Sequence, residues 1–370
     1  MKTIYKNANI VSKGIISEGI LLAENGKIQK IFTEGPLPAA DEIIDLKGDI
    51  LCGGFIDGHI HGTGGFGTDK DDANSLLKMS EILLTQGVMG FLPTLYPAPK
   101  EKLLKTLAVL SEAFGKEKGA KLVGFHLEGP FISPEKLGVM TPNSLSKIDI
   151  GFMEELYKAS DGHISSMTVA PELEGIEFLA NYARRHNIVL QAGHSNALAK
   201  DIARAKELGI KHSTHLFNAM RGFNHREIGC AGAILSDADF SAEVIADGFH
   251  IAPSAVQMIL KLKEPSKIIL VTDSLSPTGT RGGLANGEEV YFDGVVFRRK
   301  KDNVIAGSAL KMLDGVKNLV KWGMPLGAAL CTASENPSRL FDLNFGRIEN
   351  GREAKFLVLD KDLNLKRTVA

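Results

Sequence analysis

Cysteine and long apolar runs are both scarce in this sequence. Its 370 residues include three cysteines, Cys52, Cys230 and Cys331, which lie far apart without CxxC spacing. That pattern excludes a disulfide framework and a thiolate zinc site, and it fits a reducing compartment. No apolar run approaches the ~20 residues needed to cross a bilayer, and the first residues lack the apolar stretch and cleavage site of a signal peptide. We therefore expect a soluble, cytoplasmic protein.

An excess of either charge is also absent. Lysine and arginine number 43 against 44 aspartates and glutamates, which leaves a formal net charge of -1. Nucleic acids and anionic membranes attract strongly basic surfaces, so neither is expected as a partner. Hydrophobic residues make up 44% and charged residues 24% of the chain, proportions that exclude wholesale disorder. The length suits one large core with a smaller unit attached.

Short β segments separated by turn residues mark both ends of the chain. They lie at residues 8–11, 19–22, 27–31 and 354–359. Asn25-Gly26, a strong hairpin signal, separates the second segment from the third. We expect a small β-sandwich domain formed from both termini, residues 1–52 plus 346–370. Residues 53–345 would form the catalytic domain.

Between these ends, apolar strands alternate with amphipathic helical stretches. Candidate strands occupy residues 50–57, 88–94, 122–128, 166–170, 188–193, 212–215, 242–246 and 268–273. Helical stretches with apolar residues every three to four positions lie between several of them, at 73–86, 101–117, 174–186 and 198–208. Eight β-then-α units over roughly 250 residues indicate an α/β fold of the (β/α)8 TIM-barrel type. A doubly wound sheet would alternate similarly, but no glycine-rich phosphate turn follows the first strand.

The first barrel strand leads into a pair of histidines. Residues 57–61 read Asp-Gly-His-Ile-His, and alternation along an extended chain places His59 and His61 on the same face. Two imidazoles so placed can bind one metal ion. Alone, such a pair is a weak signal, because two histidines in a polar loop would look the same.

Other strand ends carry similar chemistry. They present an acidic residue or a histidine in each case: Glu128, His194, His215 and Asp273. Any one of these could be a core histidine, a salt-bridged carboxylate or a helix cap, but their joint occurrence at strand ends, where TIM barrels carry their sites, indicates a functional cluster. His126, two residues before Glu128, would lie one layer deeper in a supporting role.

The cluster offers imidazole and carboxylate ligands without thiolate. Such a set suits zinc, iron(II), manganese or cobalt, and a bound divalent ion lowers the pKa of its water to about 7. Asp273 could accept the proton of that water and deliver it to a leaving nitrogen. We therefore expect a metal-dependent hydrolase. A non-catalytic metal scaffold or sugar-phosphate sensor is the alternative from another class, although a sensor needs no proton shuttle.

In this order, the motifs resemble the amidohydrolase superfamily, which has a metal site at the mouth of a TIM barrel. Most members carry a carboxylated lysine at the end of strand four. Here that strand ends in Thr168-Val169-Ala170, and Glu128 closes strand three instead. This departure is typical of one branch, the N-acetylglucosamine-6-phosphate deacetylases. Segments that look like this branch extend over essentially the whole chain, at 54–62, 126–131, 192–197, 214–220, 245–250, 271–273 and 306–308.

The resemblance implies up to two metal positions. It makes Glu128, His194 and His215 the ligands of a principal ion. His59 and His61 would hold a second ion, with Glu128 as a bridge, although some members lack this pair and use one metal. One or two zinc, iron, manganese or cobalt ions per subunit are therefore expected. Asp273 would be the general base and then the general acid.

The resemblance also implies substrate contacts. These are assigned to Val139, Met140, Asn218, Ala219, Arg226, His250, Ile305, Ala306 and Gly307. Arg226 offers a planar fork that matches phosphate oxygens, with His250 as the second phosphate ligand. Where some relatives have a histidine near the substrate, this chain has Met140, which cannot donate a hydrogen bond.

The implied activity is removal of the acetyl group of N-acetylglucosamine 6-phosphate, giving glucosamine 6-phosphate and acetate in amino-sugar metabolism. Because of Met140, an N-acetylgalactosamine 6-phosphate deacetylase stays open as an alternative. Another amidohydrolase, such as a cyclic amidase, is disfavoured by the missing strand-four lysine. The resemblance further implies a homodimer.

Overall fold

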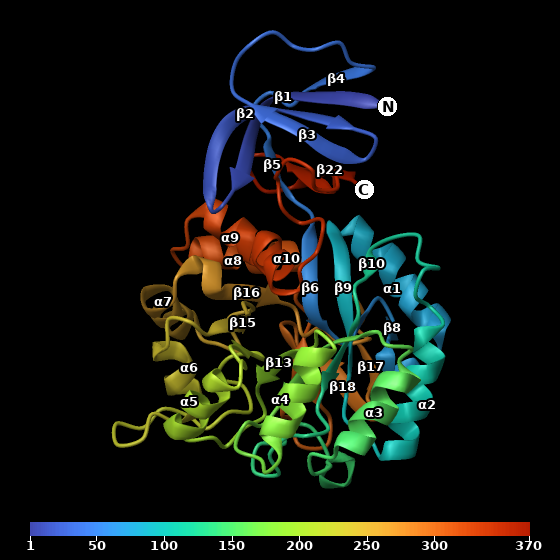
Figure 1. Cartoon of the computed structure of the whole chain (residues 1–370), viewed down its shortest axis with the longest axis vertical. Coiled ribbons are helices and arrows are strands. Elements are labelled where there is room, and N and C mark those ends of the chain that lie inside the picture. Colours follow the sequence, from blue (N-terminus) through green and yellow to red (C-terminus); the bar gives the residue numbers. More distant parts are fainter.

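A computed structural model describes residues 1–370 as a small β domain stacked on a barrel (Figure 1). Both termini lie in the small domain, whose seven-stranded sheet has the order β22-β21-β5-β1-β2-β3, with β4 beside β1. Its strands are β1 (Lys2–Ser12), β2 (Ile15–Glu24), β3 (Lys27–Phe32), β4 (Glu42–Asp45), β5 (Ile50–Gly53), β21 (Phe356–Leu359) and β22 (Leu365–Val369). A small β domain built from both termini is thereby confirmed. We propose residues 1–52 plus 346–370 as its boundaries and 53–345 as those of the barrel.

The small sheet forms where the sequence signals a hairpin. Asn25 and Gly26 have φ angles of 51° and 74°, the left-handed values that a two-residue primed turn requires. The strands they join bury one face in an apolar cluster. Within it, Tyr5 of β1 meets Phe356 of β21 edge to face, with ring centroids 5.0 Å apart. The two ends of the chain are therefore held together by aromatic packing.

The barrel consists of eight strands that pair in parallel in chain order. They are β6 (Phe55–Ile60), β9 (Val88–Leu95), β11 (Phe125–Glu128), β12 (Ile164–Val169), β13 (Val189–Ala192), β14 (His212–Ser213), β15 (Ser241–Ile245) and β16 (Ile268–Val271). Beyond β16, the N–H of Asp273 donates to the carbonyl of His59 at 2.9 Å, and the N–H of His61 donates to the carbonyl of Ser274 at 3.0 Å. These bonds connect the last strand to the first, so the predicted TIM barrel is confirmed.

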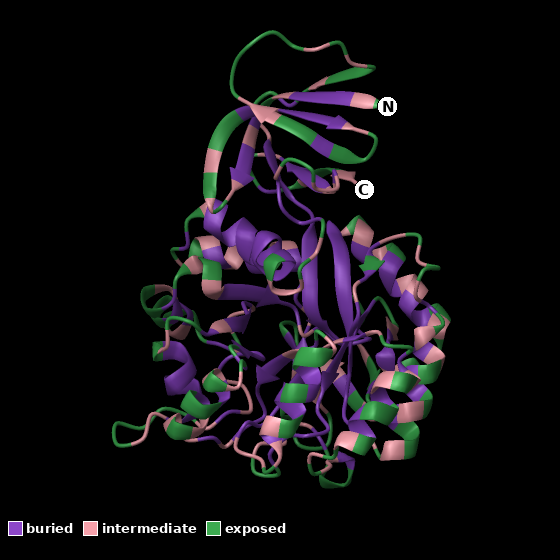
Figure 2. Ribbon diagram, in the orientation of Figure 1, coloured by how far each residue is buried: buried purple, intermediate pink, exposed green.

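Helices surround the strands. They are α1 (Ala73–Thr85), α2 (Lys100–Ser111), α3 (Ile150–Ala159), α4 (Ile176–Arg185), α5 (Ala199–Glu207), α6 (Gly229–Ser236), α7 (Pro253–Leu262), α8 (Met312–Lys321), α9 (Leu326–Ala333) and α10 (Glu335–Leu340). Figure 1 shows the last three between the barrel and the small domain. In Figure 2 the barrel strands are buried, whereas the outer helices alternate between buried and exposed positions. None of the helices combines the length and hydropathy that spanning a bilayer requires.

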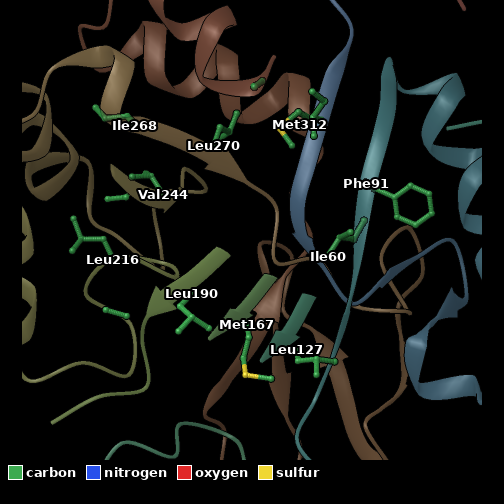
Figure 3. Packing of buried hydrophobic residues seen from close by; sticks show 14 of the residues in the cluster. Ile60, Phe91, Leu127, Met167, Leu190, Leu216, Val244, Ile268, Leu270 and Met312 are labelled. Carbon is green, nitrogen blue, oxygen red and sulfur yellow. The ribbon is translucent and has the colours of Figure 1, made fainter. Parts of the chain in front are cut away.

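The main core lies between the strands and the helices. Figure 3 shows Leu127, Met167 and Leu190 side by side on the neighbouring strands β11, β12 and β13. Because side chains alternate along a strand, these apolar residues face outward to the helices. Glu128, which follows Leu127, therefore faces the barrel interior.

Two features of the fold differ from the sequence-based expectation. The predicted strand at 50–57 is two strands, since β5 belongs to the small sheet and β6 to the barrel. The chain changes sheets at Gly53, where a Cβ atom would overlap the backbone of Gly346. The second feature is an unpredicted antiparallel sheet after β16, formed by β17 (Gly282–Ala285), β18 (Glu288–Phe292), β19 (Val296–Arg299) and β20 (Ile305–Ser308).

This additional sheet lies at the end of the barrel away from the small domain (Figure 1). The N–H of Ser308 in β20 donates to the carbonyl of Asp273 at 3.0 Å. The sheet is therefore attached directly to the segment that follows the last barrel strand. It forms part of the wall around the carboxyl ends of the strands.

Candidate active site

The side chains predicted at the strand ends meet at the mouth of the barrel. Glu128 ends β11, and His59 lies near the end of β6, two residues before His61. His194, His215 and Asp273 each follow a strand by two residues and have positive φ angles of 46°, 20° and 49°. Such angles are strained for residues with a Cβ atom and cluster at functional sites.

Glu128 and two histidines form the tightest group. The Oε1 atom of Glu128 lies 3.0 Å from Nε2 of His194 and 3.0 Å from Nε2 of His215. The two Nε2 atoms are 3.2 Å apart. All three side chains are only 4% exposed. Three potential ligand atoms therefore converge at a buried position.

Glu128 also contacts the first pair of histidines. Its Oε2 lies 3.3 Å from Nε2 of His61, and its Oε1 lies 3.7 Å from Nε2 of His59. The Oδ1 atom of Asp273 is 3.5 Å from Nε2 of His59 and 3.4 Å from Nε2 of His61. One carboxylate is thus shared between two groups of potential metal ligands, and a second carboxylate stands beside them.

The donor atoms fit a divalent cation. Nδ1 of His61 and Nδ1 of His194 face backbone carbonyls at 3.0 and 2.9 Å. Because a carbonyl can only accept, these Nδ1 atoms carry the protons, and in the neutral rings the Nε2 lone pairs face the centre. Nε2 of His59 and Oε2 of Glu128 are buried without a hydrogen-bond partner. Lone pairs that face one another in a buried site need a positive charge between them.

The electrostatics of the site lead to the same conclusion. Burial acts to lower the pKa of His59, yet the carboxylates of Asp273, Glu243 and Glu128 raise it to about 10. Burial likewise opposes ionisation of Glu128, but the adjacent imidazoles of His194 and His215 hold its pKa well below the ordinary value. The carboxylates therefore stay ionised and favour positive charge at this position, which a metal ion can supply.

Three neighbours of the cluster were not identified from the sequence as site residues. Glu243 of β15 contacts Nδ1 of His59 at 3.1 Å, and its signal was a charged residue inside the apolar strand 242–246. Tyr96 stacks on His61 with ring centroids 3.7 Å apart, and no sequence pattern marks it. Asp247 contacts Nδ1 of His250 at 2.6 Å. The only hint in the sequence was that Asp247 lies three residues before His250.

His126 has the supporting position expected for it. Its Nε2 lies 2.8 Å from the hydroxyl of Thr168, and its ring packs edge-on against His59 with centroids 4.6 Å apart. Burial and the neighbouring His59 lower its pKa to about 3. His126 is therefore a neutral histidine beneath the cluster rather than one of the converging ligands.

A cavity of about 190 Å³ opens onto the cluster. Its lining includes most of the residues predicted to contact substrate, namely Val139, Met140, Asn218, Ala219, His250, Ile305 and Ala306. Tyr96 and Asp273 also line it. The cavity therefore brings an apolar wall, the Asp273 carboxylate and the potential metal ligands into one space.

Two predicted contacts lie outside this cavity. Gly307 is turned away from it, and a Cβ atom there would overlap the side chain of Leu275. Arg226 is exposed in a loop whose base is fixed because the carboxylate of Glu227 accepts the N–H groups of Ala199 and Gly229, both at 3.0 Å. Within one chain, the structure does not bring Arg226 to the pocket, so its expected phosphate contact is not formed there.

His250 is held in a defined orientation at the edge of the cavity. Asp247 accepts from the backbone N–H groups of Phe249 and His250 at 2.8 and 2.9 Å, which fixes its carboxylate beside the imidazole. Burial acts to lower the pKa of His250, but Asp247 raises it above the ordinary value. The ring therefore keeps its proton up to a higher pH than an ordinary imidazole, which favours an anionic ligand.

Histidine and carboxylate ligands at the carboxyl ends of a (β/α)8 barrel are the arrangement of a metal-dependent hydrolase. The sequence matches the amidohydrolase family over residues 50–370, and the chain belongs to that family. It is 31% identical to N-acetylglucosamine-6-phosphate deacetylase of Bacillus subtilis (strain 168), over 99% of this chain and 95% of the relative. It is 30% identical to N-acetylgalactosamine-6-phosphate deacetylase of Escherichia coli O157:H7, over 90% of this chain and 88% of the relative.

Solved structures agree with this assignment. The crystal structure of N-acetylglucosamine-6-phosphate deacetylase from Thermotoga maritima has a TM-score of 0.88 at 32% identity, and the match covers 99% of this chain and 97% of that one. The corresponding enzyme from Pasteurella multocida has a TM-score of 0.92 at 28% identity, over 100% and 98% of the two chains. The likeness includes both the barrel and the small β domain.

Removal of the metal is expected to destabilise the folded protein, because buried lone pairs and carboxylates then lack a cation. Chelation followed by dialysis should lower the midpoint of thermal unfolding. Zn²⁺ at ~1,000 times its Kd should then restore about 4 kcal/mol of unfolding free energy. Glu128→Gln should make the midpoint insensitive to zinc. The control Glu155→Gln, on the exposed face of α3, should keep the full response. Equal midpoints for metal-free and zinc-loaded wild type would contradict the assignment.

Proposed function

We propose that this chain hydrolyses the acetamide bond of N-acetylglucosamine 6-phosphate to give glucosamine 6-phosphate and acetate. The Bacillus subtilis relative is named for this substrate, and the alignment covers 95% of it. One observation carries the proposal. The carboxylate of Asp273 stands beside two groups of metal ligands in a cavity whose edge presents His250, the imidazole paired with Asp247.

N-acetylgalactosamine 6-phosphate is the second candidate substrate. The relative from Escherichia coli is named for it. Met140 lines the cavity and cannot donate a hydrogen bond that would read the orientation of a sugar hydroxyl. Another amidohydrolase substrate is the more remote alternative. The Asp247–His250 pair favours a phosphorylated compound over a neutral one.

The metal centre is proposed to hold one or two zinc, iron, manganese or cobalt ions. Glu128, His194 and His215 would bind the principal ion, and His59 and His61 a second one. When bound, such an ion polarises the acetamide carbonyl and acidifies a water molecule. Glu128 lies 3.0–3.7 Å from all four histidines, which supports it as a residue that would help to hold both ions.

Asp273 is proposed to move the proton. Its side chain is 14% exposed, more than the ligands beside it, and it lines the cavity. Burial acts to raise its pKa, but His59 and His61 lower it below the ordinary value, so the group is a carboxylate at neutral pH. It can accept a proton from the attacking water and deliver that proton to the amine nitrogen as the C–N bond breaks.

The phosphate would bind away from the metal ligands. His250 donates Nδ1–H to Asp247 at 2.6 Å, which leaves Nε2 for the ligand. Arg226 lies outside the cavity of its own chain, and Phe223 in the same loop is 71% exposed. We therefore propose a homodimer in which this loop approaches the cavity of the second copy. The proposed location of the enzyme is the cytoplasm.

Acetate release from defined substrates tests the proposed function. Zinc-loaded protein should hydrolyse N-acetylglucosamine 6-phosphate fastest, its galactosamine epimer more slowly, and unphosphorylated N-acetylglucosamine least. Chelation should abolish release, since the carbonyl is then not polarised. Release that survives chelation, or equal turnover of the unphosphorylated sugar, would refute the proposal. Faster turnover of the galactosamine compound would select the second candidate.

Asp273→Asn should retain its metal but lose at least ~100-fold in kcat, because an amide cannot accept and return the proton. Steady-state acetate release and elemental analysis of the same preparation measure both quantities. Asp362→Asn, exposed in the turn between β21 and β22 of the small domain, is the matched control and should keep wild-type values. Near-normal turnover of Asp273→Asn would eliminate the assigned role.

Asp247→Asn should weaken phosphate binding in a pH-dependent way. Asparagine keeps the oxygen that accepts two backbone N–H groups but removes the charge that raises the pKa of His250, so the imidazole loses its proton at a lower pH. KM for the phosphosugar should rise about tenfold, more at about pH 8 than at about pH 6, with a smaller change in kcat. Inhibition by inorganic phosphate should weaken in parallel. A KM that changes equally at both pH values would show that charge on His250 is not the cause.

A further inference from the structure

Glu243 is a buried carboxylate inside the barrel that the proposed mechanism does not use. It lies within β15, among apolar neighbours, and its side chain is 1% exposed. Burying a carboxylate is costly unless its partners compensate for the lost hydration. The partners of Glu243 belong either to the proposed metal-ligand cluster or to the layer of side chains directly beneath it.

The carboxylate of Glu243 contacts both halves of the cluster. Its Oε2 lies 3.1 Å from Nδ1 of His59 and accepts the backbone N–H of His215 at 3.2 Å. Its Oε1 lies 3.7 Å from Nε2 of His212, whose Nδ1 contacts the hydroxyl of Ser241 at 2.8 Å. Glu243 is therefore fixed by His59 and His212, which do not line the cavity, and by the backbone of His215, which does.

Among the four histidines of the cluster, only His59 has a carboxylate at its Nδ1 atom, opposite the nitrogen that faces the cluster. His61 and His194 turn their Nδ1 atoms to backbone carbonyls, and Nδ1 of His215 has no partner. A carboxylate behind an imidazole fixes the ring and makes its opposite nitrogen a more basic metal ligand than a carbonyl does. The Glu243 carboxylate thus gives the His59–His61 half of the site a stronger Nδ1 partner than the His194–His215 half has.

We propose that Glu243 is the positioning residue that secures the second metal ion, by holding His59 with its Nε2 directed at Glu128 and Asp273. The inference rests on the proposed dinuclear form of the enzyme. Nε2 of His59 has no hydrogen-bond partner and lies 3.7 Å from Glu128 and 3.5 Å from Asp273. Without the charge of Glu243, the ion at His59 and His61 is released first, while the ion at the other group stays bound.

Elemental analysis after dialysis tests this inference without an activity assay. At submicromolar free zinc, the wild type should retain two ions per chain. Glu243→Gln, which keeps the shape but removes the charge, should retain one, with the affinity for the second ion lowered ~10–100-fold. Ser241→Ala in the same strand removes the partner of His212 and should retain two. One ion in the wild type, or two ions held with wild-type affinity by Glu243→Gln, would overturn the proposal.

A double-mutant cycle separates a local effect on His59 from a general loss of structure. If Glu243 acts through His59, Glu243→Gln combined with His59→Asn should retain as much zinc as His59→Asn alone. A further loss of zinc would refute the positioning role. If Glu243→Gln does not fold, Glu243→Asp replaces it, because the shorter side chain withdraws the carboxylate and should also leave one ion bound.

These outcomes are distinct from those that test the proposed function. If Glu243→Gln loses one ion while the wild type hydrolyses neither phosphosugar, the proposed function fails and the role of Glu243 stands. If the wild type hydrolyses the phosphosugar and Glu243→Gln still holds two ions with wild-type affinity, the proposed function stands and the role of Glu243 is refuted.

Discussion

The mouth of the barrel is organised around one buried carboxylate. Glu128 contacts the Nε2 atoms of four histidines that come from three different strand ends, at His59, His61, His194 and His215. Lone pairs and negative charge then face one another among buried side chains, so the arrangement requires a cation. Only a closed barrel brings these strand ends together. The hydrogen bonds that connect β16 to β6 are therefore a condition of the chemistry as well as of the fold.

Strain at the strand ends is the cost of this convergence. His194, His215 and Asp273 all adopt left-handed backbone angles, which cost about 1–3 kcal/mol each for residues other than glycine. The tightly packed core beneath them, which includes the fully buried Phe125 and Leu270, can impose such angles because the strands cannot shift to relieve them. Rigidity in the lower part of the barrel thereby holds the site in its geometry.

The sequence was most informative where a residue type and its position on a strand coincide. Eight barrel strands and the converging residues at their ends follow from periodicity and from polar residues that end apolar runs. Local patterns could not show the sheet change at Gly53, which depends on its approach to Gly346, or the sheet 282–308, whose strands are short and partly exposed. The sequence also could not predict that Arg226 is exposed outside the cavity, because a motif gives a residue type but not the path of its loop. Glu243 was visible as a charge in an apolar strand, but its partners are distant in sequence.

The attachment of β20 to the segment after β16 links part of the cavity wall to the proposed proton carrier Asp273. Ile305 and Ala306 line the cavity, and two residues later Ser308 is hydrogen-bonded to the backbone of Asp273. A substitution that reshapes this wall to admit a different sugar would also displace the proton carrier. Changes of substrate preference in this protein should therefore be easier to reach from Asn218 and Ala219, which line the cavity from a different loop, than from β20.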